Sequence, residues 1–473
     1  MSSLTKEFFI PHEQEGQYLT LPFEMPEGTD SFTLTYAYER YIPEPIQVNS
    51  GTFTARRKSN TIDLGLLAPD GSQVGASGSD KLSFTISEDH ATPGYTPRPL
   101  TPGTWQILAG AYKVAEEGVN VRYELEFTPK KAFSFLENVF QKEEQAHQPA
   151  QPQPEGLQLF LGDAHTHTIA SDGILTAEAL ASHAKSHGLD FLAITDHNQF
   201  AKTTALPHVE GITLIPGVEW THYLGHATFL GVDQPYDEPF FTNDEHEMQA
   251  RFVSAHARGA LIALAHPFDE SCPFKLAMGS LPHDCLEVWN GPMRESNLRA
   301  IGFWLQLLGT GKKIAITGGS DYHRDNLFQI LGGPCMGVYA PSRSASDILM
   351  AMRMGHSFIT FAPNGPTLHM TCGTAVMGDS LDFTEGLSLH IHADGLKAGD
   401  VLRIYSKGAP QDLLTAPADG TCDLDLPVMK PGFLVVQILR TFLPGIPPLP
   451  ALLSNAIYFD RQEQLPQAKF ELE

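Results

Sequence analysis

Between residues 157 and 362, short apolar runs alternate with amphipathic segments, and this alternation constrains the fold more than any other feature. The apolar runs are LQLFLGDAH, FLAITDHN, TLIPGVEW, ALIALAHP, CLEVWNG, KKIAITGGSD and MGVYAP. The segments between them have helical periodicity, and several end in glycine, which is typical of helix C-termini. Buried strands that alternate with helices pair in parallel, so this region predicts an α/β sheet or barrel.

The regions on either side of this segment predict β domains. Residues 1–141 contain short β-rich runs separated by Gly, Pro, Asp and Asn turns, a spacing typical of a β-sandwich. Residues 142–156 are polar and rich in Gln and Pro, and they predict a linker. Residues 363–473 return to β-rich runs such as GFLVVQILRTF. We therefore expect a second sandwich there, with the domain of residues 157–362 between the two.

Histidines and carboxylates stand at or near the carboxyl ends of the predicted parallel strands. They are His165, His167, Asp196, His197, Glu219, His266, Glu287, Asp321 and His323. His226 differs, because it opens a short strand just after Glu219. The carboxyl ends of parallel strands meet at one rim, so we expect these side chains to meet in space. Together they would repel one another or shift their pKa values unless a cation held them, and zinc, manganese or iron suits such ligands.

Each motif has an ordinary explanation when it is taken alone. The H-x-H of residues 165–167 could be a chance pair, TDHN could be a turn, and SDYH could be a helix N-cap. Their joint occurrence at successive strand ends favours a metal centre. His183 and His187, four residues apart on a predicted helix, mimic a zinc pair, but we expect them on a solvated face.

The composition limits the partners. The chain carries 31 Lys and Arg against 55 Asp and Glu, a formal net charge of −24. Such a surface repels a phosphate backbone, so we expect a small-molecule substrate and no nucleic acid. No apolar stretch approaches a membrane span and the N-terminus lacks a signal-peptide pattern, which predicts a cytoplasmic protein without a membrane partner. The five scattered cysteines predict free thiols. The oligomeric state is left open.

The order of the motifs resembles the polymerase and histidinol phosphatase (PHP) superfamily of metal-dependent hydrolases. The matching motifs are H-x-H followed by S-D-G, then T-D-H-N, G-V-E, G-H, A-H-P and G-S-D-x-H, all within residues 157–362. The stretch TPGYTPRPLTPGTW, residues 92–105, also resembles the branch that includes carbaryl hydrolase. The resemblance implies a distorted (β/α)7-type barrel flanked by the two β-sandwich domains, with two or three divalent metal ions (Zn, Mn or Fe).

Carried over residue by residue, the resemblance implies three metal positions. The first would be held by His165, His167, Glu219 and Asp321. The second would share Glu219 and be completed by His226 and His266. The third would be held by Asp172, His197 and His323. Some relatives have His where this sequence has Asp172, so this position could bind its ion loosely. Asp163 and Asn198 are expected to orient the histidine rings.

The chemistry expected of such a centre is hydrolysis. Two cations can share a water and lower its pKa, and the resulting hydroxide attacks a phosphorus or a carbonyl carbon. Glu219 and Asp321 would then be catalytic as well as metal-binding. Arg294 and Arg324 follow strand ends and could hold phosphate oxygens, although surface charge explains them equally well. His222 is a candidate proton donor to the leaving group.

Three functions remain open at this point. The first is a phosphoesterase acting on a small phosphorylated substrate. The second is a carbamate, ester or amide hydrolase, whose apolar pocket would be lined by Trp220, Tyr223, Phe268, Trp289 and Met293. The third is a non-catalytic, metal-stabilised binding protein. We disfavour the third, because a structural metal site is usually closed by about four ligands and this chain offers more.

Overall fold

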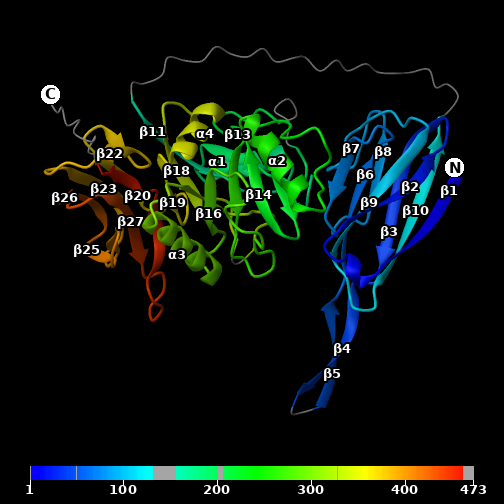
Figure 1. Ribbon diagram of the computed structural model, residues 1–473, viewed down its shortest axis with the longest axis horizontal. Coiled ribbons are helices and arrows are strands. Elements are labelled where there is room, and N and C mark those ends of the chain that lie inside the picture. Colours follow the sequence, from blue (N-terminus) through cyan, green and yellow to red (C-terminus); the bar gives the residue numbers. More distant parts are fainter. Residues whose placement is uncertain (1, 49–50, 131–155, 201–205, 327–328, 462–473) are drawn as a thin grey trace, which may run out of the picture.

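The computed structural model describes residues 2–48, 51–130, 156–200, 206–326 and 329–461, which form three parts along the long axis of the molecule (Figure 1). The chain is a mixed α/β protein with several sheets, and the four α-helices of the described residues lie in the middle part. None of the described helices has the length and apolar character needed to cross a bilayer.

Two four-stranded antiparallel sheets make up the N-terminal part and share one hydrophobic core. One sheet has the order β1–β10–β3–β8 and the other β2–β9–β6–β7. A separate pair, β4–β5, joins neither sheet. The strands are β1 (Ser2–Ile10), β2 (Tyr18–Met25), β3 (Thr29–Tyr38), β4 (Tyr41–Val48), β5 (Gly51–Lys58), β6 (Thr61–Leu67), β7 (Gln73–Ser77), β8 (Ser83–Ser87), β9 (Gly103–Lys113) and β10 (Val119–Pro129).

The two sheets differ in what covers their outer faces. Strand β10 alternates buried and exposed residues, as expected for a strand with one face in water. Strand β9 instead buries residues 107–111 without interruption. Since successive side chains of a strand point to opposite faces, the β9 sheet is covered on both sides. Its second neighbour is the middle part of the chain, which Tyr18 of β2 and Gln73 of β7 contact.

The middle part holds the strand–helix alternation expected from the sequence. Its elements are β11 (Gln158–Asp163), α1 (Ala177–Ser186), β12 (Phe191–Ile194), β13 (Thr213–His222), β14 (Gly225–Leu230), α2 (Glu245–Ala257), β15 (Leu261–Ala265), β16 (Cys285–Asn290), α3 (Glu295–Gly309), β17 (Ala315–Gly319), β18 (Cys335–Ala340), α4 (Ala345–Met354) and β19 (Ser357–Thr360). Each helix is followed by a positive-φ glycine at position 188, 259, 311 or 355, which confirms the expected glycine C-termini.

The pairing of these strands is mixed, although the sequence predicts parallel pairing. The order is β17–β16–β15–β14–β13–β12–β11–β18–β19. Strands β11, β12 and β13 are parallel, as are β15, β16 and β17. Strand β14 runs antiparallel to both of its neighbours, and β18 runs antiparallel to β11. The reason at β14 is local: His222 pairs with Gly225 across a tight turn, which leaves no room for a crossover.

The end of β17 returns to the end of β11, the first strand of this part. Thr166 and Tyr322 form a parallel bridge, and Asp321 N–H and His167 N–H donate to His165 O and Tyr322 O, each at 2.9 Å. On the other side, Thr195 N–H donates to Thr166 O at 2.9 Å. The loops that follow β11, β12 and β17 therefore lie side by side.

The C-terminal part continues the sheet of the middle part. Strand β28 pairs with β19, and the order runs on as β28–β27–β24–β25, with β29 joining β27 to β22. A second sheet has the order β21–β20–β23–β26. The strands are β20 (Thr367–Cys372), β21 (Ala375–Val376), β22 (Ser380–Asp382), β23 (Ser388–Leu396), β24 (Val401–Tyr405), β25 (Gln411–Thr415), β26 (Gly420–Pro427), β27 (Gly432–Arg440), β28 (Leu449–Ser454) and β29 (Ile457–Asp460).

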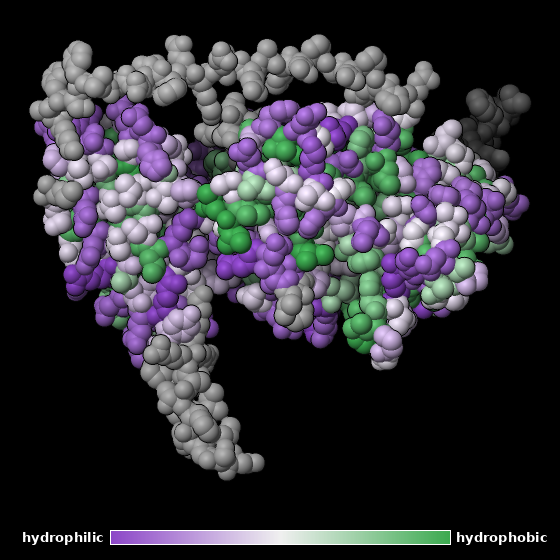
Figure 2. All heavy atoms as spheres, turned by 180° about the vertical axis from the view of Figure 1, so that it is seen from behind, coloured by the Kyte–Doolittle hydropathy of each residue, from purple (hydrophilic) through white to green (hydrophobic). Residues whose placement is uncertain are grey.

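Hydrogen bonds between β19 and β28 cross the expected boundary at residue 363, so the domain limits remain a prediction. The expected linker, residues 142–156, lies outside the described residues except for its last position. Seen from behind, the surface mixes hydrophilic and hydrophobic residues across all three parts (Figure 2).

Candidate metal centre

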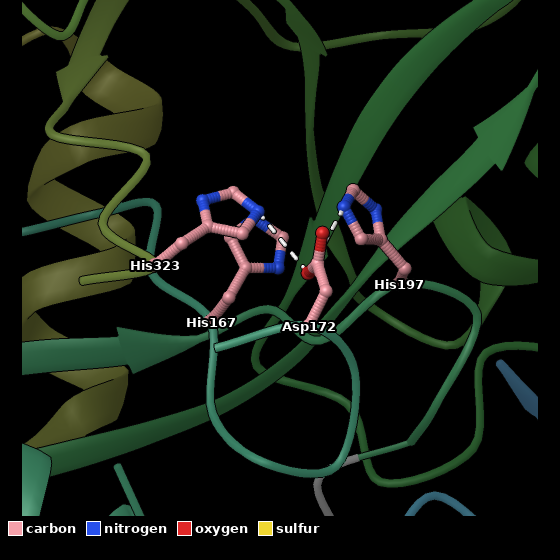
Figure 3. Close-up of side chains that lie close together, drawn as sticks. All are labelled: His167, Asp172, His197 and His323. Carbon is pink, nitrogen blue, oxygen red and sulfur yellow. Dashed lines mark ion pairs between the residues drawn. The ribbon is translucent and has the colours of Figure 1, made fainter. Parts of the chain in front are cut away.

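The nine side chains expected to bind metal come together over the strand ends of the middle part. Their ligating atoms form overlapping groups within which all atoms lie less than 4.8 Å apart. The groups are His167–Asp172–His197–His323, His165–Glu219–His266, His165–His167–Asp321, and His226–His266–Cys272. Figure 3 shows the first group, in which His323 Nε2 lies 3.1 Å and His197 Nε2 3.6 Å from Asp172 Oδ1. His183 and His187 belong to none of the groups that the described residues form.

Glu219, near the end of β13, is the centre of this constellation. His226 Nδ1 and His266 Nε2 lie 2.9 and 3.0 Å from its Oε1, and His165 Nε2 lies 3.4 Å from its Oε2. The residue has no solvent exposure. Burial by itself raises the pKa of Glu219, but His197, His165 and His226 outweigh burial and hold the pKa well below its usual value. Glu219 is therefore a buried carboxylate.

Six ligand atoms of the centre are buried and make no hydrogen bond to the described residues. They are His165 Nε2, His167 Nε2, Asp172 Oδ1, Glu219 Oε2, His226 Nε2 and Asp321 Oδ1. A buried polar atom left without a partner costs about 1–3 kcal/mol, and more when it is charged. Cations bound among these atoms would satisfy them, and imidazole nitrogen with carboxylate oxygen is a donor set that suits divalent zinc, manganese or iron. These clusters could therefore bind divalent metal.

The imidazoles are fixed through their second ring nitrogens. Glu287 Oε1 lies 2.9 Å from His165 Nδ1, Ser171 Oγ lies 3.3 Å from His167 Nδ1, and Thr221 Oγ1 lies 2.7 Å from His197 Nδ1. Such contacts leave the Nε2 atoms free for a metal and set the ring orientation. From the sequence alone, Glu287 is a carboxylate at a predicted strand end with no predicted role.

Asp163 and Asn198 orient backbone, whereas we had expected them to orient rings. Asp163 accepts from the N–H groups of Ser320 and Gly332 and from Ser320 Oγ, so it joins the ends of β11 and β17. Burial raises its pKa to about 6. Asn198 Oδ1 accepts from Thr221 N–H and its Nδ2 donates to Thr221 O. Both side chains therefore position loops that carry the candidate ligands.

Three non-glycine residues of the described chain have positive φ, and all three lie in this site: Asn198 (53°), His266 (28°) and Asp321 (51°). Each follows a strand end, where the chain has to turn while still aiming its side chain at the centre. Such conformations are uncommon outside glycine and are retained where the surroundings enforce them. The centre therefore carries local backbone strain.

His222 does not face the centre and cannot easily donate a proton to a leaving group. Its Nε2 donates to Thr242 O at 3.0 Å and its Nδ1 accepts from Leu224 N–H at 3.1 Å. Burial lowers its pKa to about 4. The ring is stacked on Trp220, with centroids 5.2 Å apart. Both ring nitrogens are occupied, so the expectation for His222 is not supported.

The two candidate arginines lie beside the centre. Arg294 donates to Asn290 Oδ1 at 3.1 Å and pairs with Asp269 at 3.5 Å. Arg324 is exposed, and its Nη2 donates to Asp172 O at 3.4 Å. Neither arginine lines the cavity described next. Their expected role toward phosphate therefore remains a prediction.

A cavity of about 480 Å³ opens onto the centre, and the N-terminal part supplies one of its walls. His197 and His226 line it on one side, and Tyr18, Asp63 and Tyr112 line it on the other. None of the five residues expected to form an apolar pocket lines it. Trp220 and Trp289 are instead buried in the core of the middle part, and Tyr223, Phe268 and Met293 pack against that core.

The N-terminal part is held against the rim by specific contacts. Tyr18 OH donates to Thr221 O at 3.2 Å and Gln73 Nε2 donates to Asn198 O at 3.0 Å. Lys81 Nζ donates to the carbonyl oxygens of Ala170 and Ser171, in the loop that leads to Asp172. Thr221, Asn198 and this loop all belong to the candidate centre, so the two parts share one site.

Comparisons with known proteins give local matches. No family model matches the chain. A segment of 103 residues is 36% identical to the 5'-3' exoribonuclease Rnm of Salmonella typhimurium, and 82 residues are 42% identical to the Escherichia coli protein of that name. These segments cover 19% and 15% of this chain, and the chain spans about a third of the length of these curated relatives, 34% and 27%.

Two solved structures resemble the chain distantly. One is a two-domain protein from Bacteroides vulgatus containing a predicted PHP-like metal-dependent phosphoesterase, with 18% identity, 66% of this chain and 100% of that chain covered, and a TM-score of 0.38. The other is an amidohydrolase from Chromobacterium violaceum, with 16% identity, 36% and 89% covered, and a TM-score of 0.26. Likenesses at this level are too weak to establish a shared fold.

Proposed function

We propose that this protein is a metal-dependent hydrolase that cleaves a phosphoester of a small substrate. The observation that carries the proposal is the set of six buried nitrogen and oxygen atoms of the candidate ligands that make no hydrogen bond to the described residues. Imidazoles and carboxylates from separate strand ends would be unstable together without cations. The open cavity beside them gives a substrate access.

The proposed ligand set follows the groups of the centre. His165, His167, Glu219 and Asp321 hold one ion, and Glu219 with His226 and His266 holds a second. Asp172, His197 and His323 hold a third. Bound divalent ions would activate water and stabilise the charge that develops on the cleaved group.

The residues of the chain prepare this site without taking part in bond breaking. Glu287, Ser171 and Thr221 hold imidazoles through their second nitrogens, so that the metal-facing nitrogens are already directed inward. The N-terminal wall limits the water that reaches the site and orients the substrate in the cavity. Glu219 and Asp321 are the two carboxylates of the first proposed ion position.

The family resemblance and the curated relatives support this proposal. We propose that the strand path from β11 to β17, joined at the Thr166–Tyr322 bridge, is the distorted barrel expected of the PHP superfamily. The relatives that match 103 and 82 residues are named exoribonucleases, enzymes that cleave phosphodiesters. The net charge of −24 and the absence of Lys and Arg from the described residues that line the cavity favour a small substrate over nucleic acid.

A second candidate is hydrolysis of an uncharged carbamate or ester at the same centre. The observation in its favour is the cavity wall, which includes Tyr18, Leu108, Tyr112 and Phe240. No lysine or arginine stands among the described residues that line this cavity. A phosphate would then depend on metal alone for positive charge, whereas an aromatic ester would gain from the apolar wall.

A substrate panel tests the reaction class. The full-length protein is loaded with zinc, manganese or iron and offered p-nitrophenyl phosphate mono- and diesters, p-nitrophenyl carboxyl esters and aryl carbamates. Turnover of the phosphates supports the first candidate, and turnover of carbamates or carboxyl esters supports the second. If metal-loaded protein cleaves none of these compounds, both candidates fail.

The variant Asp321→Asn separates an enzyme from a structural metal protein. It keeps the shape of the side chain but removes its charge from the centre. We expect turnover to fall at least tenfold while the protein stays folded, because one ligand of the proposed metal pair is weakened. Asp237→Asn is the control, since Asp237 is exposed and pairs with Arg258 at 2.7 Å. A large loss of thermal stability with unchanged turnover would instead support a structural site.

A further inference from the structure

A cysteine lies in the candidate metal centre, although the scattered cysteines of the sequence predict only free thiols. Cys272 lies in the loop after β15, and its Sγ is 3.7 Å from His266 Nδ1. Together with His226 and His266 it forms a group whose three ligating atoms lie within 4.8 Å of one another. Cys272 also lines the cavity beside His226. The thiol therefore faces the same space as the candidate ligands.

A second observation at this group points to a ligand. His226 is only 6% exposed, and its Nδ1 is occupied by Glu219 Oε1 at 2.9 Å. Its other nitrogen, Nε2, is buried and makes no hydrogen bond to the described residues. The group that contains Cys272 thus includes a histidine with a buried nitrogen that makes no hydrogen bond to the described residues, which is unfavourable unless something else binds there.

The remaining contacts of the thiol are long. Cys272 Sγ lies 3.7 Å from Asp269 Oδ1, and Ser271 Oγ lies 3.6 Å from Cys272 Sγ. Thiols form weak hydrogen bonds, so these long contacts with Asp269 and Ser271 do little to fix the Cys272 side chain in its position beside His266. The other cysteines are different: Cys285, Cys335 and Cys372 are buried, Cys422 is half-buried in β26, and none of the four belongs to a ligand group found among the described residues.

We propose that Cys272 is a metal ligand and holds a divalent ion together with His226 and His266. This inference rests on the proposed metal centre and deepens it. On binding, the thiol proton is lost to solvent and the sulfur–metal bond forms, with no change in oxidation state. A thiolate is a soft ligand that suits zinc and disfavours manganese. The structure thus assigns zinc-like preference to one position of the centre and leaves the others suited to harder ions.

Cobalt(II) reports thiolate ligation directly. Metal-free full-length protein is titrated with cobalt(II), and absorption is recorded in the near ultraviolet, where thiolate-to-cobalt charge transfer appears. We expect this band in the wild-type protein and in Cys422→Ser, and its loss in Cys272→Ser. In parallel, the zinc affinity of Cys272→Ser, measured by competition with a chromophoric chelator, should be at least about tenfold lower than that of the wild-type protein. Mutating a group that only supports a metal ligand already lowers metal affinity by about tenfold or more, so losing a ligand should cost at least as much. Manganese affinity should change much less.

Chemical protection gives a readout that does not depend on the cobalt band. Bound zinc should slow alkylation of Cys272 at least tenfold, as mapped by mass spectrometry, whereas Cys422 should react at an unchanged rate. A folded Cys272→Ser protein that keeps the charge-transfer band, or zinc that leaves Cys272 alkylation unaffected, would overturn the proposal. Cobalt uptake without any charge-transfer band would overturn thiolate ligation alone. Failure to take up metal at all would overturn the proposed hydrolase as well.

Discussion

Gly94 lies against the loop that positions Asp172. Its φ is +94°, and a Cβ added there would lie 2.3 Å from Ala170 O, in the loop that leads to Asp172. Relieving this contact requires a displacement of about 1 Å. Ala170 and Ser171 also accept from Lys81, so the loop is pressed against the N-terminal part at this point. Gly94→Ala should therefore push the loop and its ligand away from the centre.

Two effects of this substitution can be separated. Alanine at positive φ is strained by about 1–2 kcal/mol wherever it stands. Gly71 provides a matched control, because its φ is +80° and nothing lies within 4 Å of an added Cβ. Both variants should therefore lose similar stability from strain. Only Gly94→Ala should also misplace Asp172, and misplacement by about 1 Å can lower a rate by about 100-fold.

The assay compares kcat/KM of Gly94→Ala, Gly71→Ala and wild type on whichever p-nitrophenyl substrate is cleaved, at saturating metal and below the unfolding temperature of each. A 100-fold difference corresponds to about 2.7 kcal/mol of transition-state stabilisation. Metal content, determined on the same samples, should fall for Gly94→Ala alone. If the two glycine variants fold and have the same kcat/KM, the contact between the N-terminal part and the Asp172 loop has no functional role.

Three further outcomes follow from the contacts of the chain. Glu287→Gln should weaken metal affinity about 10–100-fold in a chelator competition, because it removes the negative charge beside His165 Nδ1. The control, Glu295→Gln on the exposed face of α3, should leave metal affinity unchanged. Metal at a hundred times its dissociation constant should stabilise the protein by about 2.7 kcal/mol, seen as a higher midpoint in thermal unfolding than in chelator. Asp400→Ala should lose about 3–5 kcal/mol in urea unfolding with unchanged kcat/KM, because it removes the buried carboxylate that pairs with Arg440 at 2.6 Å in the C-terminal part.

The helices and strands of the middle part and its polar cluster could be predicted because short stretches of sequence determine both. Each ligand motif directly follows an apolar strand, so a strand boundary is enough to place the side chain at the rim. His226 joins the others for a reason that the sequence did not show. Strand β14 is antiparallel to β13, so its first residues lie beside the last residues of β13, opposite Thr221.

The expectation for His222 ignored the period of the strand. Successive side chains point to opposite faces, so residues 219 and 221 share one face while residue 222 lies on the other. Thr221 accordingly contacts His197, and His222 stacks on Trp220. The predicted run TLIPGVEW ended at Trp220, whereas β13 continues to His222, so the alternation at residues 221 and 222 lay beyond the predicted strand. The antiparallel direction of β18 had no comparable local signal, because it depends on where the chain returns after residue 332.

The sequence contains a sign that the N-terminal part packs against the middle part, and it lies in the pattern of one strand and not in the overall composition. The run WQILAGAY in β9 lacks the polar alternation of the run VRYELEF in β10. Residues 105, 107, 109 and 111 of β9 enter the core between the two sheets, whereas Leu108, Gly110 and Tyr112 line the cavity. A strand that is apolar on both faces needs a second partner. Here that partner is the rim of the candidate centre.

Charge in the cavity makes anion binding depend on metal. Asp63, Asp80 and Asp172 line it, and Glu219 is ionised close by. Without cations these carboxylates repel a phosphate, whereas each divalent ion adds two positive charges at the centre. Inorganic phosphate should therefore bind the metal-loaded protein in isothermal calorimetry and fail to bind the chelator-treated protein. An uncharged aryl carbamate should bind both forms with similar affinity, because its apolar contacts with Tyr18 and Tyr112 persist. Phosphate that bound equally well without metal would show that a cation of the chain itself, rather than a metal, recognises the anion.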